Sequence, residues 1–460
     1  MKKVLLIVIL LLCFNGFAQN QVANWYFGKG AGINFNIDTG AVTSLIDGQL
    51  STLEGCTSIS DENGDLVLYT DGSTVYNKNH QIMQNGTGLY GSSSATQSAI
   101  VVPAPKNPEL YYIFTVDTSV NDGTNYGFNY SIVDITLNGG LGAVTTKNTN
   151  LLAHCSEKIT AVLKDCISES VWVITFASVD GSVNPFNTYH AFEVSTTGVN
   201  STSVVSTFTE ISESLADNDY RGQIKVSPDG NKLASANMSG SLFLHDFNTD
   251  TGTVTNQQPL AINTISPSPY GVEFSPNSEL LYIHSSNDTI YHLSASNHQS
   301  SLTQFNLKAT DIQASEFTVD QQQLYRGSLQ LGPNGKIYRA LSENYLTGLP
   351  YLGVINNPNA VGAACNYQHN AVSVSPNLST QGLPPFIQSF FNDQIDIIQN
   401  SISAIDLSLC NGESYILKYD EIQNAVYTWY KDDVILPETD FDLIITEPGN
   451  YKLTISTNSS

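Results

Sequence analysis

A short strand–turn–strand unit recurs along the chain and constrains the fold more than any other feature. In each clear copy a glycine opens an alternating strand, a turn containing Pro-Asp or Pro-Asn follows, and a second strand returns. The second strands cover residues 232–235, 280–284 and 336–340. The glycine, first strand and turn of the clear copies lie within residues 220–230, 270–277 and 325–335. A fainter copy covers residues 372–377.

Earlier parts of the chain keep the hairpin but lack the proline. The paired segments are 55–61 with 66–69, 100–102 with 111–114, and 159–162 with 171–174. With the later copies they make seven units, roughly 50 residues apart, and this period with several short strands per unit indicates a β-propeller. We therefore predict an all-β, seven-bladed propeller over residues 24–391 with few helices. The third and fourth units are longer, which leaves six or eight blades open.

The predicted ring needs a closure, because its last unit has too few strands. The N-terminal strands at 25–27 and 33–35 have no inner strand and resemble the outer half of a blade, as residues 243–252 do. We expect closure by exchange, in which a C-terminal hairpin supplies the inner strands and the N-terminus supplies the outer ones. Such closure removes the exposed edges of an open ring.

The pattern changes after Phe391. Residues 392–402 are predicted to form a linker, and residues 403–460 carry short strands at 407–409, 415–417, 426–430, 443–445 and 451–455. Cys410, Trp429 and a corner that ends at Tyr451 are typical of an immunoglobulin-like or PKD-like sandwich, although Leu453 stands where a second cysteine belongs. Roughly 60 residues is short for such a sandwich, so we expect an incomplete, truncated domain.

The N-terminus has the form of a secretory signal peptide. A basic pair, Lys2-Lys3, precedes an apolar run and the small residues Gly16 and Ala18, which predicts cleavage after Ala18 and a mature chain that starts at Gln19. Acylation of Cys13 is the rival interpretation, but Leu12 is bulky where a lipoprotein signal wants a small residue. Elsewhere no apolar run approaches ~20 residues, so no membrane span is predicted. Secretion to the medium or the cell surface is the expected localisation.

Charge and cysteine content narrow the partners and the compartment. The formal net charge is −24, and charged residues make up 13% of the chain. Nucleic acid and anionic membranes require a basic face, so both are excluded as partners. Five cysteines remain after Ala18, which is too few for a disulfide scaffold. Their pairing stays open, as does the choice between a Cys155–Cys166 bridge and free thiols. The mature cysteines are Cys56, Cys155, Cys166, Cys365 and Cys410.

Sequence motifs for catalysis or cofactor binding are lacking. No Gly-x-Ser-x-Gly elbow, His-Glu-x-x-His pair or Ser-x-Asp-x-Gly box occurs, and a strand follows the glycines of 28–32 where a dinucleotide loop needs a helix. His284 and His292 are too few for a zinc site. The acidic turns 61–65 and 246–250 place oxygen ligands at alternate positions, as calcium loops do, but hairpin turns need the same residues. No metal or cofactor is predicted.

One set of polar side chains is predicted to converge. The inner strands of a propeller start on one face around the central channel, and Arg221 and Arg326 both stand just before the glycine that opens such a strand. Two readings stay open: a solvent-facing mouth that binds an anionic group, or ion pairs that hold the blades together. The predicted site comprises Glu54, Gln97, Lys158, Arg221, Arg326 and Asn370.

Several segments of residues 24–391 together resemble one family of proteins. The family comprises the large secreted modular proteins of gliding Bacteroidetes, with an N-terminal propeller, immunoglobulin-like or PKD-like modules and a gliding-motility-associated C-terminal sorting domain. The resemblance implies export by the Sec and type IX routes, although the sorting domain is lacking here. The segments that carry the resemblance are 24–28, 53–56, 69–72, 76–80, 96–100, 137–142, 157–162 and 382–391.

The favoured interpretation is a secreted or surface protein that is not an enzyme. Its propeller would bind a glycan or a surface protein, with a role in adhesion or gliding, and type IX machinery would be a further partner if a sorting domain follows. The alternative is a propeller hydrolase or lyase that acts on polysaccharide. Fold alone does not separate these functions, and the ligand and the oligomeric state stay undetermined.

Overall fold

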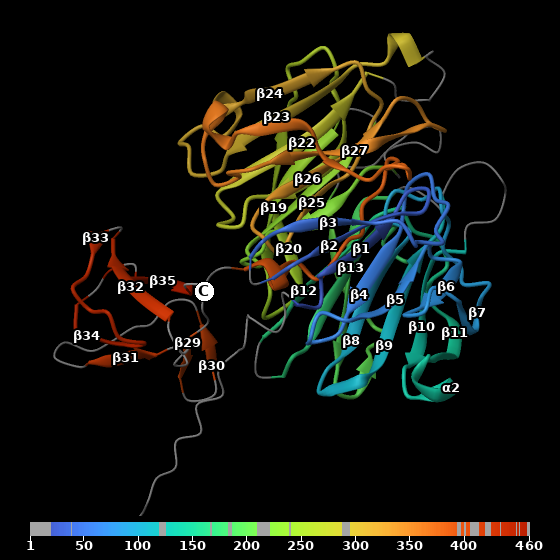
Figure 1. The fold of residues 1–460 in the computed structure, drawn as a ribbon, viewed down its shortest axis with the longest axis horizontal. Helices are drawn as coiled ribbons and strands as arrows, with labels where there is room; N and C mark the ends of the chain where they lie inside the picture. The colour runs from blue at the N-terminus through green and yellow to red at the C-terminus, as the bar shows by residue number, and fades with distance from the viewer. Residues whose placement is uncertain are drawn as a thin grey trace, which may run out of the picture. The chain divides into compact units, whose positions relative to one another are not determined.

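The computed structural model confirms an all-β protein. By contacts the chain divides into two compact units, Met1–Ser403 and Ala404–Ser460. Figure 1 shows the strands of the first unit running from blue at the N-terminal end to orange. The structure describes residues 20–37, 39–118, 126–165, 168–182, 186–208, 221–238, 241–287, 295–392, 397–399, 402–404, 414–418, 425–432, 434–447, 449 and 451–457.

The first half of the first unit consists of antiparallel meanders, in which each strand pairs with the next one along the chain. A single parallel pair, Ala143 with Gln84, joins the second and third meanders at their outer strands. The strands are β1 (Asn24–Phe27), β2 (Ala31–Phe35) and β3 (Val42–Leu45); β4 (Thr57–Ser60), β5 (Leu66–Thr70), β6 (Thr74–Asn77) and β7 (Ile82–Thr87); β8 (Ala99–Ala104), β9 (Asn107–Val116), β10 (Phe128–Asp134) and β11 (Ala143–Leu152).

The second half repeats the arrangement. In the first of its sheets both β15 and β16 pair with β14. The strands are β12 (Ile159–Leu163), β13 (Val171–Ala177), β14 (Thr188–Ser195), β15 (Gly198–Val199) and β16 (Val204–Thr207); β17 (Ile224–Val226), β18 (Lys232–Asn237), β19 (Ser241–Asn248) and β20 (Thr253–Leu260); β21 (Ser268–Phe274), β22 (Leu280–Ser286), β23 (Ser300–Asn306) and β24 (Phe317–Gln322); β25 (Leu329–Leu331), β26 (Ile337–Ser342), β27 (Gly348–Ile355) and β28 (Tyr367–Ser373).

Helical structure is limited to single turns among the described residues, as predicted. They are α2 (Leu137–Gly140) and the 3₁₀ turns η2 (Ala295–Asn297), η3 (Gln313–Ser315), η4 (Gly362–Cys365) and η5 (Gln388–Phe391). In the described part of the chain no helix has the length and apolarity needed to cross a membrane.

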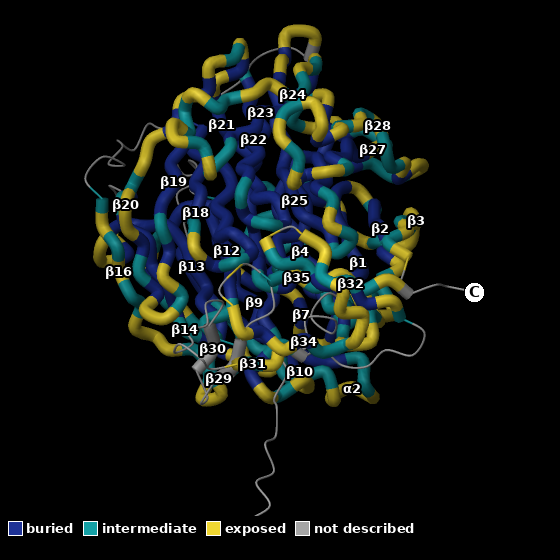
Figure 2. The backbone as a smooth tube through the Cα atoms, turned by 90° about the vertical axis from the view of Figure 1, so that its left-hand side faces the viewer, coloured by how far each residue is buried: buried dark blue, intermediate teal, exposed yellow. Residues whose placement is uncertain are grey.

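The sheets follow one another around a common axis, which makes the first unit propeller-like. Figure 2 looks roughly along that axis, with β4, β12 and β25 near the centre and β3, β16 and β24 toward the rim. Backbone hydrogen bonds join the first strands of neighbouring sheets at one end: Gly55 N donates to Ala95 O, Gln97 N to Glu157 O, and Gln223 N to Tyr270 O. We call this end the mouth.

The predicted hairpins are confirmed by the strand pairing. The registers of β4 with β5, β8 with β9 and β12 with β13 match the three proline-free units. Those of β17 with β18, β21 with β22 and β25 with β26 match the three clear copies. The fainter copy at 372–377 was wrongly predicted as an inner strand. Val372 and Ser373 belong to β28, which pairs with β27 as the outermost strand of its sheet.

Apolar side chains fill the layers between neighbouring sheets. Between the β4–β7 and β8–β11 sheets lie Leu68, Met83, Val101 and Ile113, all at most 3% exposed. Every blade-like sheet is covered on both faces, so its strands are apolar over several consecutive residues, as in β13, where every residue from Val171 to Ala177 is buried. This continuous burial keeps the sheets together.

The two ends of the first unit lie side by side. Lys29, in the turn after β1, forms bridges with both Ser51 and Leu378. Further along, Gln381 N donates to Leu53 O, and Ser328 N donates to Gln381 O, so Gln381 lies between the starts of β25 and β4. The chain therefore reaches the mouth once more after β28, as a segment without regular strand pairing.

The second unit has a small core of its own. β31 (Tyr415–Lys418) pairs with β34 (Asp442–Ile445), and β32 (Ala425–Lys431) pairs with β33 (Val434–Ile435) and β35 (Tyr451–Thr457). Trp429, Leu443 and Ile445 form its buried centre. The hydroxyl of Tyr451 donates to Glu447 O at 2.8 Å, a link of the kind made by tyrosine corners. Cys410 lies outside the described residues. The remaining described strands, β29 (Ile397–Gln399) and β30 (Ile402–Ala404), pair with each other.

Candidate functional site

Five of the six predicted site residues converge at the mouth. Each precedes the first strand of its sheet, where neighbouring sheets approach the axis. All five are buried, with exposed fractions of 1% for Glu54, 1% for Gln97, 0% for Lys158, 6% for Arg221 and 1% for Arg326. Of the two readings left open by the sequence, this burial contradicts the solvent-facing mouth and supports pairing between the sheets, because the side chains reach one another or the opposing backbone.

Arg326 and Glu54 form a buried ion pair. The guanidinium Nη2 lies 2.9 Å from Glu54 Oε1, and Nε donates to Gln381 Oε1 at 2.7 Å. Tyr270 donates its hydroxyl to the other Glu54 oxygen at 2.5 Å, and its ring lies 4.8 Å from the guanidinium carbon. Burial alone would lower the pKa of Arg326, but the charge of Glu54 raises it above the ordinary value, so the guanidinium stays charged.

Glu157 is a second buried carboxylate at the mouth. Its Oε2 accepts hydrogen bonds from Thr96 N and Thr96 Oγ1, both at 3.0 Å. Burial, and then the charge of Glu54, raise the pKa of Glu157 to about 7, while Arg221 opposes the shift. The sequence analysis missed Glu157, although it stands directly before Lys158.

Gln97 and Lys158 satisfy backbone groups of other sheets. Gln97 Oε1 accepts from Ile159 N at 3.3 Å and from Ile224 N at 2.8 Å, which links three sheets through one side chain. The ammonium of Lys158 donates to the carbonyls of Arg221, Gly222 and Ala236. First strands have an unpaired edge toward the axis, and these side chains supply the partners that its backbone groups need.

A second polar layer lies further along the axis. Lys225 and Glu273 are fully buried and lie 2.9 Å apart. Glu273 Oε2 also accepts from Leu331 N at 2.9 Å, and Gln223 Oε1 accepts from Val272 N and Leu329 N, each at 3.1 Å. The axis of the ring is thus occupied by paired side chains.

The chain beyond Gln381 also runs along the axis. Gly382 lies against the Glu54 backbone, where a Cβ would stand 1.6 Å from the Glu54 carbonyl oxygen. Pro385 O then accepts from Thr57 Oγ1, Ile387 bridges to Ala161, and Leu163 N donates to Ser389 Oγ. We call residues 382–391 the axial segment. It lies along the axis of the ring, next to the first strands β4 and β12.

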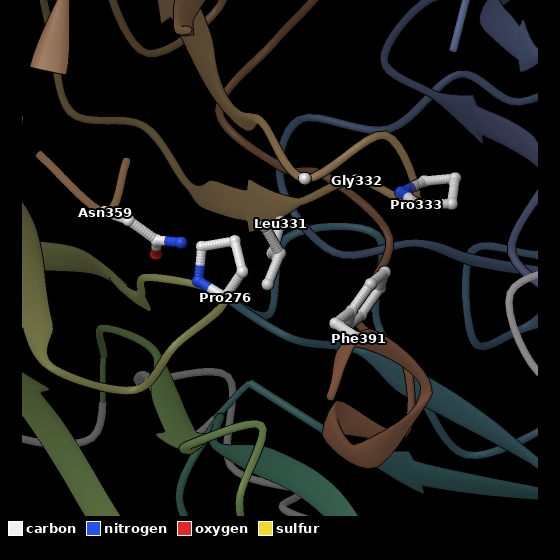
Figure 3. Close-up of a pocket in the computed structure, with 7 residues that line it drawn as sticks. Pro276, Leu331, Gly332, Pro333, Asn359 and Phe391 are labelled. Atoms are coloured by element: carbon white, nitrogen blue, oxygen red, sulfur yellow. The ribbon is translucent and has the colours of Figure 1, made fainter. Parts of the chain in front are cut away.

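A cavity of about 210 Å³ lies where the axial segment ends (Figure 3). Pro276 and Pro333 belong to the turns after β21 and β25, and Phe391 closes the other side. None of the lining residues ionises, so the cavity offers no acid, base or nucleophile. The lining comprises Pro276, Leu331, Gly332, Pro333, Gly335, Asn359 and Phe391.

Asn370 does not belong to the mouth. It lies within β28, exposed and with a positive φ of 55°, at an irregular pairing with β27. The reason is that the fourth strand of this sheet uses the residues that were predicted to open another blade. Gln381 takes the expected place instead.

The other sites considered from the sequence have structural partners. Asp61 Oδ1 accepts from Asn63 N and Asp65 N, as in an ordinary hairpin turn, and Asp246 pairs with Lys232. His284 lies against Arg339, and burial together with that charge lowers its pKa. His292 lies outside the described residues. Within the described ranges, no three metal-ligating side chains gather.

Cysteine pairing stays undecided. Cys56 and Cys365 are buried free thiols. Cys155 is buried, but Cys166 and Cys410 lie outside the described residues, so a Cys155–Cys166 bridge stays a prediction.

A signal for the missed residues existed in the sequence. Glu54, Arg221 and Arg326 each precede a glycine, and the same is true of Tyr270 and Gln381. The glycine recurs because adjacent first strands touch there: a Cβ on Gly271, in β21, would stand 2.4 Å from Gly327 O, just before β25. Reading every residue before such a glycine would have found Tyr270 and Gln381.

Comparisons with known proteins give structural similarity at low sequence identity. Neither a protein-family model nor a curated protein matches the chain. The crystal structure of a candidate 6-phosphogluconolactonase from Bacteroides fragilis matches with a TM-score of 0.44 and 12% identity, over 78% of this chain and 97% of that one. A candidate 6-phosphogluconolactonase from Bacteroides uniformis matches with a TM-score of 0.38 and 13% identity, over 95% and 100%. Identity this low transfers no activity.

Proposed function

We propose that the chain is an exported binding protein without catalytic activity, whose propeller presents one face to a glycan or a surface protein. The observation that carries the proposal is the Glu54–Arg326 pair, with both side chains 1% exposed and 2.9 Å apart. The convergent charges of the mouth are used to hold sheets together, which supports the structural reading of these residues. We therefore assign binding to the exposed loops around the mouth.

The mouth side is our candidate for the binding face. The connection between β7 and β8, residues 88–98, begins and ends on this side, and it carries the exposed Tyr90. On the opposite side the turns after the first strands are short, as at 227–231 and 275–279. Long loops on a rigid scaffold are where proteins usually place recognition.

The proposal includes a seven-bladed ring closed by exchange of the chain ends. The three-stranded β1–β3 sheet lacks a first strand, and Gln381 occupies the position of one between Ser328 and Leu53. A single C-terminal segment, in place of the predicted hairpin, would then complete the blade. Pro384 and Pro385 have no N–H to donate, which accounts for the lack of regular pairing there.

The second unit and the export route complete the proposal. An immunoglobulin-like or PKD-like spacer is supported by the core around Trp429 and by the Tyr451 hydroxyl bond.

Export by the Sec and type IX routes, with a role in surface adhesion or gliding, rests on the resemblance of residues 24–391. The predicted signal peptide lies within residues 1–19, outside the described part. The intact mass of the exported protein tests cleavage after Ala18, and a lipid on Cys13 would contradict it.

One observation favours the alternative, an enzyme acting on polysaccharide. Glu54 and Glu157 are neighbouring buried carboxylates, and the pKa of Glu157 is raised to about 7. Glycosidases use a carboxyl pair with one raised pKa. Both side chains are 1% exposed, so a substrate would have to displace the axial segment or the loops to reach them.

The deciding experiment measures binding and turnover on the same polysaccharides and surface proteins. We expect retention of the protein on at least one partner, with no release of reducing or unsaturated sugar ends. Turnover that Glu157→Gln abolishes, with folding intact, would replace the binding proposal with the enzyme. Arg221→Ala should leave binding unchanged, because Arg221 is only 6% exposed.

A further inference from the structure

Two solvent-exposed tyrosines stack on each other on the mouth side. The rings of Tyr90 and Tyr126 lie 4.2 Å apart with planes 13° from parallel. Tyr90 is 38% exposed and Tyr126 is 47% exposed, although each covers one face of the other. Among the described residues neither hydroxyl has a hydrogen-bond partner, whereas the hydroxyl of Tyr282, for example, donates to Pro358 O. The pair is therefore an aromatic surface and not part of a core.

Asparagine side chains fix the backbone on both sides of this pair. Asn148 Oδ1 accepts from Tyr90 N at 3.0 Å, and its Nδ2 donates to Gly88 O at 2.8 Å. Asn129 Nδ2 donates to Tyr126 O at 2.7 Å. Tyr126 N donates to a carboxylate oxygen of Asp117 at 3.3 Å. Each tyrosine is thus placed before any ligand arrives.

A β-bulge directs one of these asparagines. Asn148 has a positive φ of 56°, within the irregular pairing of β10 with β11. Bulges re-aim side chains and gather next to functional sites. Here the bulge turns the Asn148 amide toward the loop that carries Tyr90. The same loop leads on to Gln97, so the pair stands on the mouth side of the ring.

The chemistry around the pair suits a neutral sugar. A pyranose has an apolar face of C–H groups that stacks on an aromatic ring, while its hydroxyls can donate to an amide oxygen such as Oδ1 of the exposed Asn150, whose Nδ2 donates to Leu152 O at 3.0 Å. The nearby ionic groups are already engaged: Asp117 is 7% exposed, and Lys147 Nζ donates to Thr87 O at 2.7 Å. A chain with a net charge of −24 disfavours acidic polysaccharides.

We infer that Tyr90 and Tyr126 form a platform that binds the pyranose rings of a neutral polysaccharide. The inference rests on the proposed binding function and names its ligand class and its place. Stacking on the exposed ring surface supplies the affinity, and the asparagines keep the two rings in position. Ordering costs little at binding because hydrogen bonds already hold the backbone of both tyrosines.

The test compares single variants of the full-length protein on soluble β-glucan, mannan and xylan, with alginate as the acidic comparison. Tyr90→Ala and Tyr126→Ala should each weaken binding to a neutral polymer about tenfold or more, the loss of one stacked ring. Tyr90→Phe should keep most of the binding, because stacking needs the ring and not the hydroxyl. Tyr351→Ala is the matched control, since Tyr351 is 37% exposed on β27 of another sheet.

Three results would overturn the platform. They are wild-type affinity in both alanine variants, an equal loss in Tyr351→Ala, and no wild-type binding to any neutral polymer. Salt-sensitive binding to alginate alone would contradict the neutral class. Each of these leaves the proposed function standing if the protein still binds a surface protein, whereas turnover of a polymer would sink the proposed function itself. Equal melting temperatures exclude misfolding of the variants.

Discussion

The first unit is held together in two different ways, between its sheets and along its axis. Between sheets, apolar side chains such as Leu68 and Ile113 pack in continuous layers. Along the axis, buried polar side chains have specific partners. Lys225 forms an ion pair with Glu273, and Gln97 Oε1 accepts a hydrogen bond from Ile224 N. The two regions are buried to the same degree but differ in chemistry.

The difference lies in how each region responds to a change. A packed apolar layer loses stability in proportion to the volume removed, and it tolerates swaps of similar size. A buried ion pair loses its whole contribution to stability when one partner is deleted, because the other partner stays buried and charged without a counter-ion or water. The axis should therefore be the more specific and the more fragile of the two regions.

The largest effect is expected from removing the axial segment. A chain shortened to end at Ala371 loses the axial segment, Gln381 with its bonds to Leu53 and Ser328, and the last two residues of β28. We expect the cooperative thermal transition, followed by circular dichroism, to disappear. A chain ending at Asn392 keeps the segment and serves as the control. A sharp melt for both chains would show that the axis is dispensable.

The next effect separates buried from exposed charge. Arg326→Ala leaves Glu54 buried and unpaired, which should cost about 3–5 kcal/mol of unfolding free energy. The matched change is Lys308→Ala, whose 3.6 Å pair with Glu279 leaves the two side chains 71% and 46% exposed. That surface pair should contribute less than about 1 kcal/mol. Denaturant titrations measure the unfolding free energy of both variants. Equal losses in Arg326→Ala and Lys308→Ala would show that buried and exposed ion pairs do not differ in their contribution to stability.

The smallest effect is a pH dependence that belongs to the axis. Burial raises the pKa of Glu157 from 4.5 to about 7, so the folded protein holds a proton that the unfolded chain has released. The stability that this proton contributes is full below pH 4.5 and is lost as the pH rises toward 7. Glu157→Gln should flatten this decline, measured as urea midpoints across the window, while Glu279→Gln should not. An unchanged slope in Glu157→Gln would place the titration elsewhere.

Local pattern was enough to predict the sheets. Alternating strands and Pro-Asn or Asn-Gly turns lie close together in the chain, so hairpins such as β17 with β18 follow from a few adjacent residues. The outer strand β28 was misassigned because the Ser375-Pro376-Asn377 turn that follows it looks like the turn of an inner hairpin. Only the count of strands already used in that sheet distinguishes the two.

The mouth was predictable in part, for a physical reason. A glycine at the start of several first strands, such as Gly55 and Gly271, marks where backbones touch, and that mark is local. The pairing of Glu54 with Arg326 joins residues 272 positions apart, and Gln97 reaches Ile224 across 127. Sequence placed the charges on one face but could not show that they reach each other. Of the two readings left open, the burial of these side chains supports ion pairing, and five of the six predicted residues converge.

The axial segment has a mechanical consequence. A pull on the chain beyond Asn392 enters the first unit at the centre of the ring, where Ile387 bridges to β12 and Pro385 holds Thr57 of β4. Tension is then shared among several first strands, instead of peeling one outer strand such as β28 from its neighbour. A pulling force that enters at the axis therefore does not detach the outer strands one after another.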